Sequence, residues 1–306
     1  ENLTRIEAAE RAELLEVSSY TVELDLMKGE EVFGATTTVK FNSHKIGAST
    51  FIDAITKTVH RVTLNGKDLD VSAVSDGIRI QLDNLQAENE LVVVSDNPYM
   101  HTGEGLHRFV DPVDQEVYLY TQFEVPDSRR MFAVFEQPDL KATFQFTVSA
   151  PSKWKMISNS PTPTPVDRGD GTSIWVFAPT PRISSYITAL IAGPYSEWRD
   201  QLTSSDGRTI PLGVYGRSSL AKYIDADYIF EKTKEGFVFF EEQFQYPYPF
   251  EKYDQIAVVD FNFGAMENAG AVTFREDVLV FRSHMPDKAY LSRANTILHE
   301  MAHMWF

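Results

Sequence analysis

The sequence predicts two domains, a mainly β sandwich or saddle over residues 1–196 and the opening part of an α+β domain over residues 197–306. In the first part apolar and polar residues alternate, which is the two-residue period of a sheet with one buried face. In the second part apolar residues recur at the three- and four-residue steps typical of helices. Gly193-Pro194 lies where the pattern changes and predicts the domain boundary.

The first domain is expected to contain a short helix followed by a twisted antiparallel sheet. Residues 1–15 form a charged, alanine-rich pattern typical of a helix. Asn65-Gly66 is a strong signal for a two-residue hairpin turn. Residues 161–165, rich in proline, are expected to form a surface loop because strands resume beyond them. Alternating apolar residues predict strands within 20–26, 37–41, 62–64, 78–82, 117–123, 142–148, 174–177 and 186–192.

The second domain is expected to combine strands with two longer helices. Apolar runs predict strands at 210–215 and 256–259, and the alternating pair Val278 and Val280 is also typical of a strand. One helix is predicted to start at Asp225 or Asp227 and to end before Pro247. Its buried residues are expected to be Phe230, Phe237, Phe240 and Phe244. A last helix starts at Pro286-Asp287, and its buried stripe is expected to be Leu291, Ala294, Leu298, Met301 and Trp305.

The most chemically specific motif is His299-Glu300-Met301-Ala302-His303. Residues four apart lie on one face of a helix, so His299 and His303 can bring two imidazole nitrogens to one Zn²⁺, with Glu300 beside them as a candidate general base. At about 100° per residue, both histidines fall opposite the expected apolar stripe and can line a cleft. A catalytic zinc site needs three protein ligands and a water, so this pair needs another ligand. Taken alone, the same pattern also fits an ordinary amphipathic helix.

A second segment, Gly264-Ala265-Met266-Glu267-Asn268, lies between the run 256–259 and the last helix. It is expected to form a loop or sheet edge leading toward that helix. A glycine there lets the backbone approach a ligand closely. The carboxylate of Glu267 would be costly to bury unless a cation pairs with it, and without one it is a solvated acid in a turn.

Together, Gly264 to Asn268 and His299 to Phe306 resemble the aminopeptidase N family of zinc exopeptidases. That family carries Gly-x-Met-Glu-Asn before a His-Glu-x-x-His-x-Trp-Phe helix. Gln122-Phe123-Glu124 and residues 135–144 also resemble the family's Gln-x-Glu and Phe-Asp-Glu-Pro-x-x-Lys-Ala segments, with Glu136-Gln137 in place of Asp-Glu. The motifs cover the chain from about Gln122 to its end, and the resemblance implies a thermolysin-like zinc peptidase domain for residues 197–306.

The resemblance implies one Zn²⁺ per chain in the intact protein, with His299 and His303 as ligands and Glu300 as general base. The family's third ligand, a glutamate, and a tyrosine that stabilises the oxyanion come after the position of Phe306. We therefore expect the 306-residue chain alone to hold zinc weakly and to be inactive or nearly so.

The resemblance also implies a site for a peptide with a free amino terminus. Two carboxylates that converge on one point favour a positive charge, and a peptide's amino terminus brings one next to its first amide bond. The implied roles are α-ammonium binding for Glu124 and Glu267 with help from Gln122, backbone alignment of the peptide for Gly264 and Ala265, and a share in the pocket wall for Gln122 and Met266.

Composition narrows the function further. The chain has a net charge of −16 at pH 7, which argues against nucleic-acid binding because that needs a basic patch. It contains no cysteine, so it has neither disulfides nor thiolate metal ligands, as expected in a reducing compartment. We find no signal-peptide pattern and no run of about 18 apolar residues. The sequence therefore favours a cytoplasmic protein without membrane contact, with the oligomeric state open and a monomer favoured.

Two other functions stay open. A zinc endopeptidase would cleave internal bonds of a peptide whose amino terminus is blocked, and a non-catalytic scaffold would keep the fold without the chemistry. Relatives in the wider family also hydrolyse a lipid epoxide, which the sequence does not exclude. The remaining histidines lack partner spacing and are expected to be surface or hydrogen-bonding residues, namely His44, His60, His101, His107 and His284.

Overall fold

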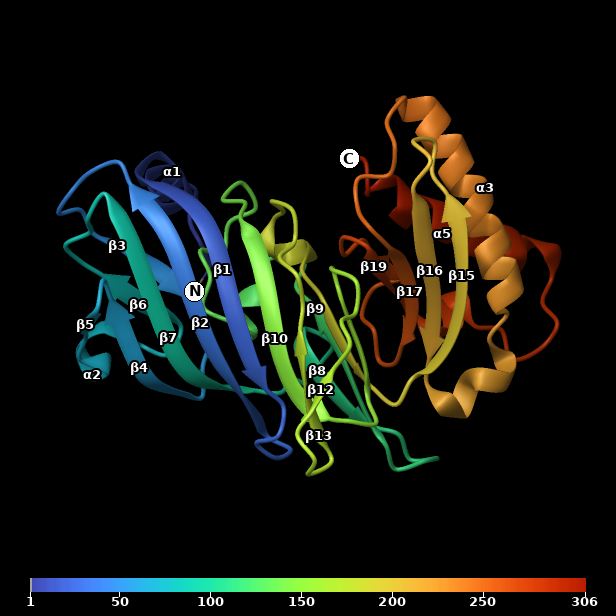
Figure 1. Ribbon diagram of the computed structural model, residues 1–306, viewed down its shortest axis with the longest axis horizontal. Helices are drawn as coiled ribbons and strands as arrows, with labels where there is room; N and C mark the ends of the chain where they lie inside the picture. The colour runs from blue at the N-terminus through green and yellow to red at the C-terminus, as the bar shows by residue number, and fades with distance from the viewer. Residues whose placement is uncertain (1) are drawn as a thin grey trace. The chain divides into compact units, whose positions relative to one another are not determined.

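The computed structural model describes residues 2–306 and divides the chain into two compact units (Figure 1). Unit 1 contains the chain up to His107, together with Thr121–Lys153 and Thr162–Thr188. Unit 2 contains Arg108–Tyr120, Trp154–Pro161 and Ala189–Phe306. The main boundary thus falls between residues 188 and 189, whereas the sequence placed it between 196 and 197. Two short stretches of the expected first domain also belong to unit 2.

Unit 1 begins with helix α1, Arg5–Leu14, as expected from residues 1–15. Its start is a capping box, in which the Glu7 amide donates to the Thr4 hydroxyl at 3.2 Å and the Thr4 amide donates to the Glu7 carboxylate at 2.8 Å. The helix is fastened to the unit by Arg11, whose buried guanidinium lies 2.9 Å from the Asp53 carboxylate.

The main sheet of unit 1 has eight strands in the order β12-β13-β10-β1-β2-β7-β4-β5 (Figure 1). The strands are β1 Leu15–Asp25, β2 Val32–Ser43, β4 Thr58–Leu64, β5 Lys67–Asp68, β7 Glu88–Pro98, β10 Thr143–Pro151, β12 Val166–Asp167 and β13 Thr172–Val176. Burial alternates along β1 and β2, which confirms the two-residue period read from the sequence. The turn between β4 and β5 has positive φ at Asn65 and Gly66, as the hairpin signal predicted.

The expectation of a purely antiparallel sheet is wrong at one place, because β1 and β10 pair in parallel. These strands are separated by more than a hundred residues, and a long connection is what parallel pairing needs. The smaller elements of unit 1 are β3 Thr50–Asp53, β6 Arg79–Leu82, α2 Val71–Val74 and two short 3₁₀ helices, η1 Ser128–Arg130 and η2 Ser185–Ile187.

A four-stranded sheet has the order β11-β14-β9-β8. Its strands are β8 Gly105–Val110, β9 Val117–Gln122, β11 Lys155–Ser158 and β14 Leu190–Gly193. The strand expected at 186–192 therefore starts late, because the 3₁₀ turn η2 precedes it. The Thr188 hydroxyl donates to the Ser185 carbonyl at 2.7 Å and closes that turn.

The main sheet of unit 2 has five strands in the order β15-β16-β17-β19-β18, and α3 lies along β15 and β16 (Figure 1). The strands are β15 Ser196–Thr203, β16 Thr209–Gly216, β17 Tyr253–Val258, β18 Ala265–Met266 and β19 Ala271–Arg275. The sequence pattern missed β19, because four of its five residues are buried and show no alternation. The strand expected at Val278 and Val280 is wrong, since the helical turn α4, Glu276–Leu279, occupies that place.

Two helices of unit 2 pack against each other, α3 Ala226–Phe244 and α5 Asp287–Ala302, while η3 Ser218–Tyr223 precedes them. Gly236 lies at the contact between α3 and α5. A Cβ added there would lie 2.5 Å from Leu298 Cδ2 and 2.7 Å from Met301 Sδ. Glycine therefore lets the two helices approach closely.

The buried face of α5 differs from the expected stripe, of which only Met301 is buried while Ala294, Leu298 and Trp305 are half-buried. The other buried residues of the helix are Arg293, Ile297 and Glu300. Leu291 is 71% exposed, whereas Arg293 is buried. The Arg293 guanidinium lies 4.4 Å from the ring centres of Tyr228 and Phe281, and it donates to the Asp225 carboxylate at 3.1 Å. Aromatic rings and an ion pair thus bury a cation at a position that the apolar pattern did not assign to the core. Asp225 is the residue before α3, but its carboxylate bonds Arg293 and not a helix amide.

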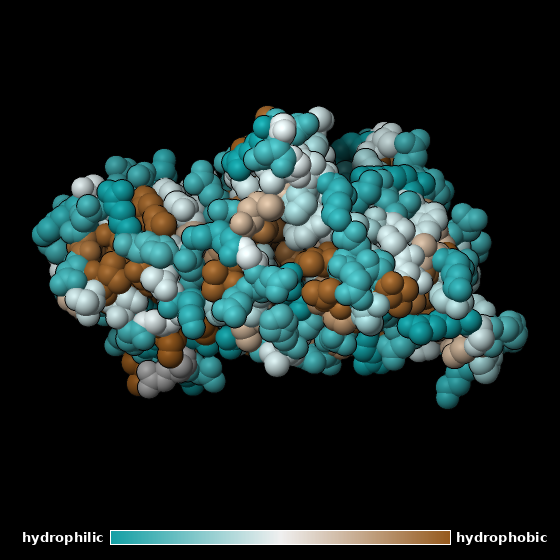
Figure 2. Space-filling model, turned by 90° about the horizontal axis from the view of Figure 1, so that it is seen from below, coloured by the Kyte–Doolittle hydropathy of each residue, from teal (hydrophilic) through white to brown (hydrophobic). Residues whose placement is uncertain are grey.

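On the face shown in Figure 2, hydrophilic residues predominate and hydrophobic ones form scattered patches between them. This surface agrees with the net charge of −16. Across residues 2–306, every helix is too short or too polar to cross a membrane.

Candidate metal centre

Helix α5 carries the His-Glu-x-x-His motif at its carboxyl end. The helix ends at Ala302, and His303 follows as its cap residue with helical φ and ψ, so the four-residue spacing still brings both histidines to one face. His299 is exposed and His303 is half-buried, whereas Ile297 and Met301 are buried in the core of unit 2. The expected separation of the histidines from the packing face is confirmed.

The two imidazoles are close enough to share a metal ion. The Nε2 atoms of His299 and His303 lie 3.4 Å apart, and the ring centres lie 5.0 Å apart. Two zinc–nitrogen bonds of about 2.0–2.1 Å at a tetrahedral angle span about 3.4 Å between the nitrogens. The spacing in the structure therefore fits two ligands of one zinc ion. Within residues 2–306, only this pair and Glu300 form a group of three possible ligands, with all three atoms within 4.8 Å of one another.

Glu300 lies beside the two histidines, with a carboxylate oxygen within 4.8 Å of their ring nitrogens, and is 6% exposed. Its negative charge acts on the buried Tyr253 of β17, whose pKa is raised first by burial and then by Glu300. The carboxylate thus lies between the histidine face and the sheet, next to the metal group but shielded from bulk water. A shielded carboxylate is suited to holding a proton.

Glu267 follows the edge strand β18 of the same unit. Ala265 and Met266 pair with Phe274 and Thr273 of β19, and β18 is the last strand of the sheet. The Glu267 side chain is half-buried, and none of the hydrogen bonds or ion pairs found among the described residues involves its carboxylate. It is available for a cationic ligand.

The neighbouring residues of this segment differ in exposure. Gly264 is exposed, and a Cβ added there would meet nothing within 4 Å, so space is open on that side of the backbone. Met266 is fully buried, which places its side chain in the interior of unit 2. Helix α5 contacts β18, and the Gly270 amide lies 3.5 Å from Met304 Sδ, so the Glu267 segment and the histidine helix meet.

The remaining expected site residues, Gln122 and Glu124, belong to unit 1. Glu124 is exposed, whereas Gln122 is buried and its side-chain oxygen accepts the Glu124 amide at 2.7 Å. The Asp127 amide donates to the Phe123 carbonyl at 3.1 Å and closes a turn beyond Glu124. The structure thus gives this carboxylate a fixed backbone and an open side chain within its own unit.

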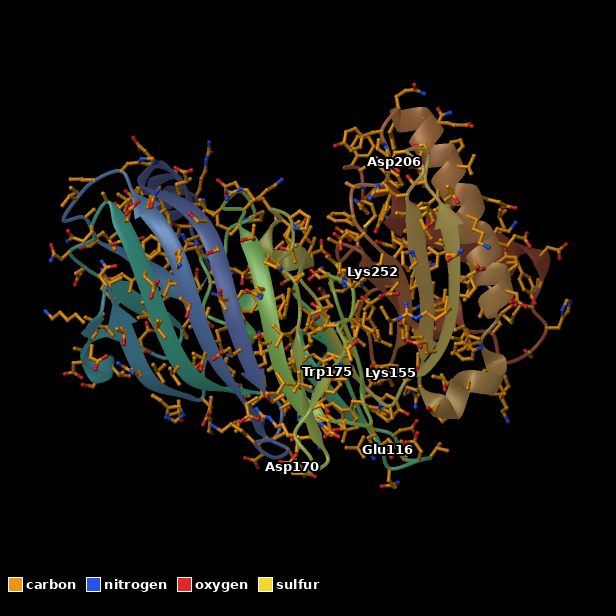
Figure 3. All side chains as sticks on the ribbon, viewed as in Figure 1. Glu116, Lys155, Asp170, Trp175, Asp206 and Lys252 are labelled. Atoms are coloured by element: carbon orange, nitrogen blue, oxygen red, sulfur yellow. The ribbon has the colours of Figure 1, made fainter. Side chains whose placement is uncertain are left out.

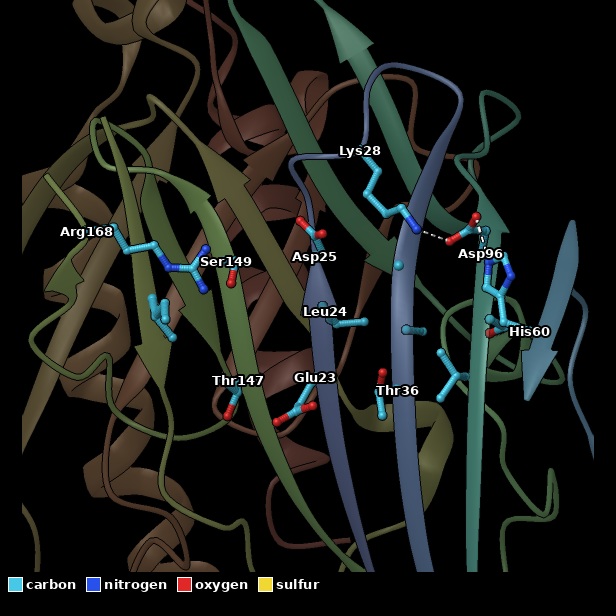
Figure 4. A pocket seen from close by; sticks show the side chains of 15 residues that line it. Glu23, Leu24, Asp25, Lys28, Thr36, His60, Asp96, Thr147, Ser149 and Arg168 are labelled. Atoms are coloured by element: carbon cyan, nitrogen blue, oxygen red, sulfur yellow. Dashed lines mark hydrogen bonds and ion pairs between the residues drawn. The ribbon is translucent and has the colours of Figure 1, made fainter. Parts of the chain in front are cut away.

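A depression on the main sheet of unit 1 differs from the metal group in that its charged side chains include ones that pair with one another (Figure 4). Asp96 binds Lys28 at 2.5 Å and His60 at 3.0 Å, so its carboxylate already has two partners. Burial opposes ionisation of Asp96, but the hydrogen bonds from Lys28 and His60 keep its pKa below the usual value. We therefore regard these groups as a paired surface network.

Comparison with known proteins agrees with this geometry. A model of the Peptidase M1 N-terminal domain matches residues 17–187, and a model of the Peptidase family M1 domain matches residues 228–306. The chain therefore belongs to peptidase family M1, whose members are in general zinc-dependent. The resemblance and the fold class expected from the sequence are confirmed.

Among its relatives, aminopeptidase N of Streptomyces lividans is 58% identical over 308 residues, which cover 100% of this chain and 35% of that protein. Aminopeptidase N of Acetobacter pasteurianus is 33% identical over 224 residues, covering 70% of this chain and 60% of the relative. Aminopeptidase Ey of Gallus gallus is 36% identical over 200 residues, covering 62% and 20%. The chain thus spans only part of the length of the relatives it matches.

Proposed function

We propose that this chain is part of a zinc-dependent aminopeptidase that removes amino-terminal residues from peptides. The observation that carries the proposal is the 3.4 Å separation of the His299 and His303 Nε2 atoms on the helix matched by the family model. Two imidazoles at this distance suit one zinc ion, and Glu300 adjoins them. Relatives named aminopeptidase N support the reaction class.

In this proposal His299 and His303 hold one Zn²⁺ per chain, and a further protein ligand completes the three that a catalytic site needs. When bound there, zinc supplies Lewis-acid activation of water and of the scissile carbonyl. Glu300 takes the proton from the attacking water and later passes it to the leaving amine. Its burial supports this role, because a shielded carboxylate exchanges protons with the reactants before it does so with solvent.

Glu267 is the proposed partner of the substrate's α-ammonium group. The support is its place beside an open sheet edge and the availability of its carboxylate. We propose the same role for Glu124, with Gln122 fixing its backbone. The exposed backbone of Gly264 and the edge strand at Ala265 are suited to align an extended peptide by main-chain hydrogen bonds.

Further parts of the proposal concern the pocket and the surroundings. Gln122 and Met266 contribute to the wall of the pocket for the first residue, and the buried position of Met266 suits a supporting contact beneath that wall. The protein works on peptides with a free amino terminus in the cytoplasm, as a monomer and without nucleic acid. The net charge of −16 supports attraction of cationic amino termini.

Metal analysis combined with an aminoacyl arylamide panel tests the proposal. Both measurements are made on this chain and on a longer chain that continues past Phe306, as the family resemblance implies. In the longer chain, His299→Ala is expected to lose zinc, while Glu300→Gln keeps zinc and loses at least about 100-fold in kcat. The exposed His284→Ala is the control and is expected to change neither. Retention of zinc by His299→Ala would show that the metal is held elsewhere.

Substrate choice separates the aminopeptidase from the endopeptidase. Glu267→Gln is expected to raise KM for free-amine substrates, because a carboxylate that pairs with the ammonium is lost. An amino-acetylated peptide is expected to resist cleavage. Cleavage of that peptide at an internal bond, at a rate equal to that of the free-amine peptide, contradicts the proposal and supports a zinc endopeptidase.

A further inference from the structure

A buried lysine in unit 2 holds the backbone beside the proposed ammonium-binding carboxylate. Lys252, labelled in Figure 3, directly precedes β17 and is 3% exposed. Its ammonium group donates to the Ser158 carbonyl at 2.5 Å, to the Asp254 carboxylate at 2.7 Å and to the Gly270 carbonyl at 2.9 Å. All three donors of the ammonium group are therefore used.

The Gly270 carbonyl belongs to the turn formed by residues 268–271, which joins Glu267 to β19. The Ala271 amide donates to the Asn268 carbonyl at 3.0 Å, and the Asp254 amide donates to the Gly270 carbonyl at 3.0 Å. The side-chain amide of Asn159, directly after β11, donates to the Ala269 carbonyl at 2.9 Å. Side chains from two distant segments thus bind consecutive carbonyls of this turn.

The same turn touches the end of the histidine helix, because the Gly270 amide lies 3.5 Å from Met304 Sδ and Met304 follows His303. Gly270 has a φ of +67°, and a Cβ there would lie 3.1 Å from the Lys252 carbonyl oxygen. The backbone is therefore fixed on both sides. A shift of the turn would move Glu267 relative to His303, and geometry of this kind controls how well a substrate is held.

A buried ammonium is a costly means of fixing a turn. Burial lowers the pKa of Lys252, and the neighbouring Asp254 only partly opposes this. Apolar side chains of similar volume often stabilise a fold as well as a buried ion pair does. What the ammonium provides, and an apolar side chain does not, is a directional bond to two carbonyls on separate segments.

We propose that Lys252 and Asn159 are positioning residues that set Glu267 relative to the histidine helix, and so determine the affinity for the substrate's amino terminus. The inference rests on the proposed aminopeptidase function. Neither residue touches the reacting atoms. Both act through the carbonyls of the turn at residues 268–271.

The test uses the longer chain described above and a double substitution, Lys252→Met with Asp254→Asn. The second change removes the carboxylate that would otherwise stay buried without its cation. Asn159→Asp is the second variant, since Asp keeps an acceptor for the Ala189 amide but places an oxygen against the Ala269 carbonyl. Lys234→Met, at a half-buried lysine paired with Asp200, is the control.

Both variants are expected to raise KM for an aminoacyl arylamide by about tenfold or more, with kcat and zinc content close to those of the parent. A purely structural role would lower the amount of folded enzyme, and hence the maximal rate, while KM stays unchanged. An unchanged KM in both variants overturns the inference.

Hydrogen exchange gives a readout that does not depend on activity. The Asp254 and Ala271 amides are expected to exchange faster in both variants than in the control, at matched global stability. If the parent enzyme shows no aminopeptidase activity, the proposed function fails, and this exchange measurement still decides whether the two residues fix the turn. If Glu267→Gln raises KM but the two variants leave KM and exchange unchanged, only the inference fails.

Discussion

The two units each place a proposed substrate carboxylate before a turn that is held by a buried charge, but the charges have opposite signs. In unit 1 the turn beyond Glu124 offers donors: the Ser128 hydroxyl and the Arg129 amide donate to the Glu136 carboxylate at 2.6 and 2.7 Å. An anion is what such donors need.

In unit 2 the turn after Glu267 offers acceptors, and Lys252 donates to the Gly270 carbonyl. The sign of the buried charge therefore follows from which backbone groups the turn leaves to be satisfied. The two charges also differ in their compensation, because Lys252 has the carboxylate of Asp254 beside it, whereas Glu136 relies on hydroxyl and amide donors. This difference predicts different responses to mutation and pH.

The largest expected effect is on the compensated charge. Lys252→Met alone leaves Asp254 buried without a cation, and we expect it to lower the free energy of unfolding by about 3–5 kcal/mol. Urea unfolding of the parent, this variant and the double variant with Asp254→Asn measures it. The double variant is expected to recover part of the loss, and equal losses in the two variants would show that the ion pair is not what stabilises the site.

The next effect is pH dependence in unit 1. Burial raises the pKa of Glu136 to about 7, although hydrogen bonds from Ser128 and the Arg129 amide oppose the rise. The folded state thus binds the proton more tightly than the unfolded state, in which the pKa of the carboxyl has its ordinary value of 4.5. The resulting stabilisation is complete below about pH 4.5 and is lost as pH rises through about 7, a change on the order of 3 kcal/mol.

Thermal unfolding of the parent and Glu136→Gln between pH 4.5 and 8 tests this expectation. The variant has no carboxyl to titrate at that position, so its stability is expected to fall less over the range. Glu242→Gln, at an exposed position, is the control and should keep the profile of the parent. Parallel profiles for the parent and Glu136→Gln would contradict the raised pKa.

The smallest effect concerns the turn of unit 2 itself. Gly270→Ala is expected to cost about 1–2 kcal/mol, because alanine is unfavourable at positive φ. Gly169 has a φ of +79° with nothing within 4 Å of an added Cβ, so Gly169→Ala measures the cost of the backbone conformation alone. A larger loss of stability for Gly270→Ala than for Gly169→Ala measures the contact of the added methyl group with the Lys252 and Asn159 carbonyls. Equal losses would mean that the turn moves enough to make room for the methyl group.

The sequence predicted those parts of the protein in which local pattern and burial agree. The alternation of apolar and polar residues located β1 and β2, because each of these strands has one buried face. It missed β19, which is buried throughout, and it misread Val278 and Val280, which lie in and just after a helical turn. Leu291 was assigned to the wrong face because nothing in a residue pattern shows that aromatic rings will bury Arg293.

The residues of the candidate site also divide into those that the sequence pattern predicted and those that it did not. The histidine pair and Glu300 could be read from the sequence because a helix turns a fixed spacing into a shared face. Lys252 and Asn159 could not, since their partners are main-chain carbonyls, which every residue carries, at positions remote in the sequence. A lone lysine before an apolar run was the only local signal, and it says nothing about partners.

The discontinuous make-up of unit 2 limits how this polypeptide can be divided. A gene segment that starts at residue 197 would encode both histidines and Glu267 but would lack residues 154–161, and with them Ser158 and Asn159. Complementation of such a segment by a separately expressed amino-terminal piece would have to restore those two contacts.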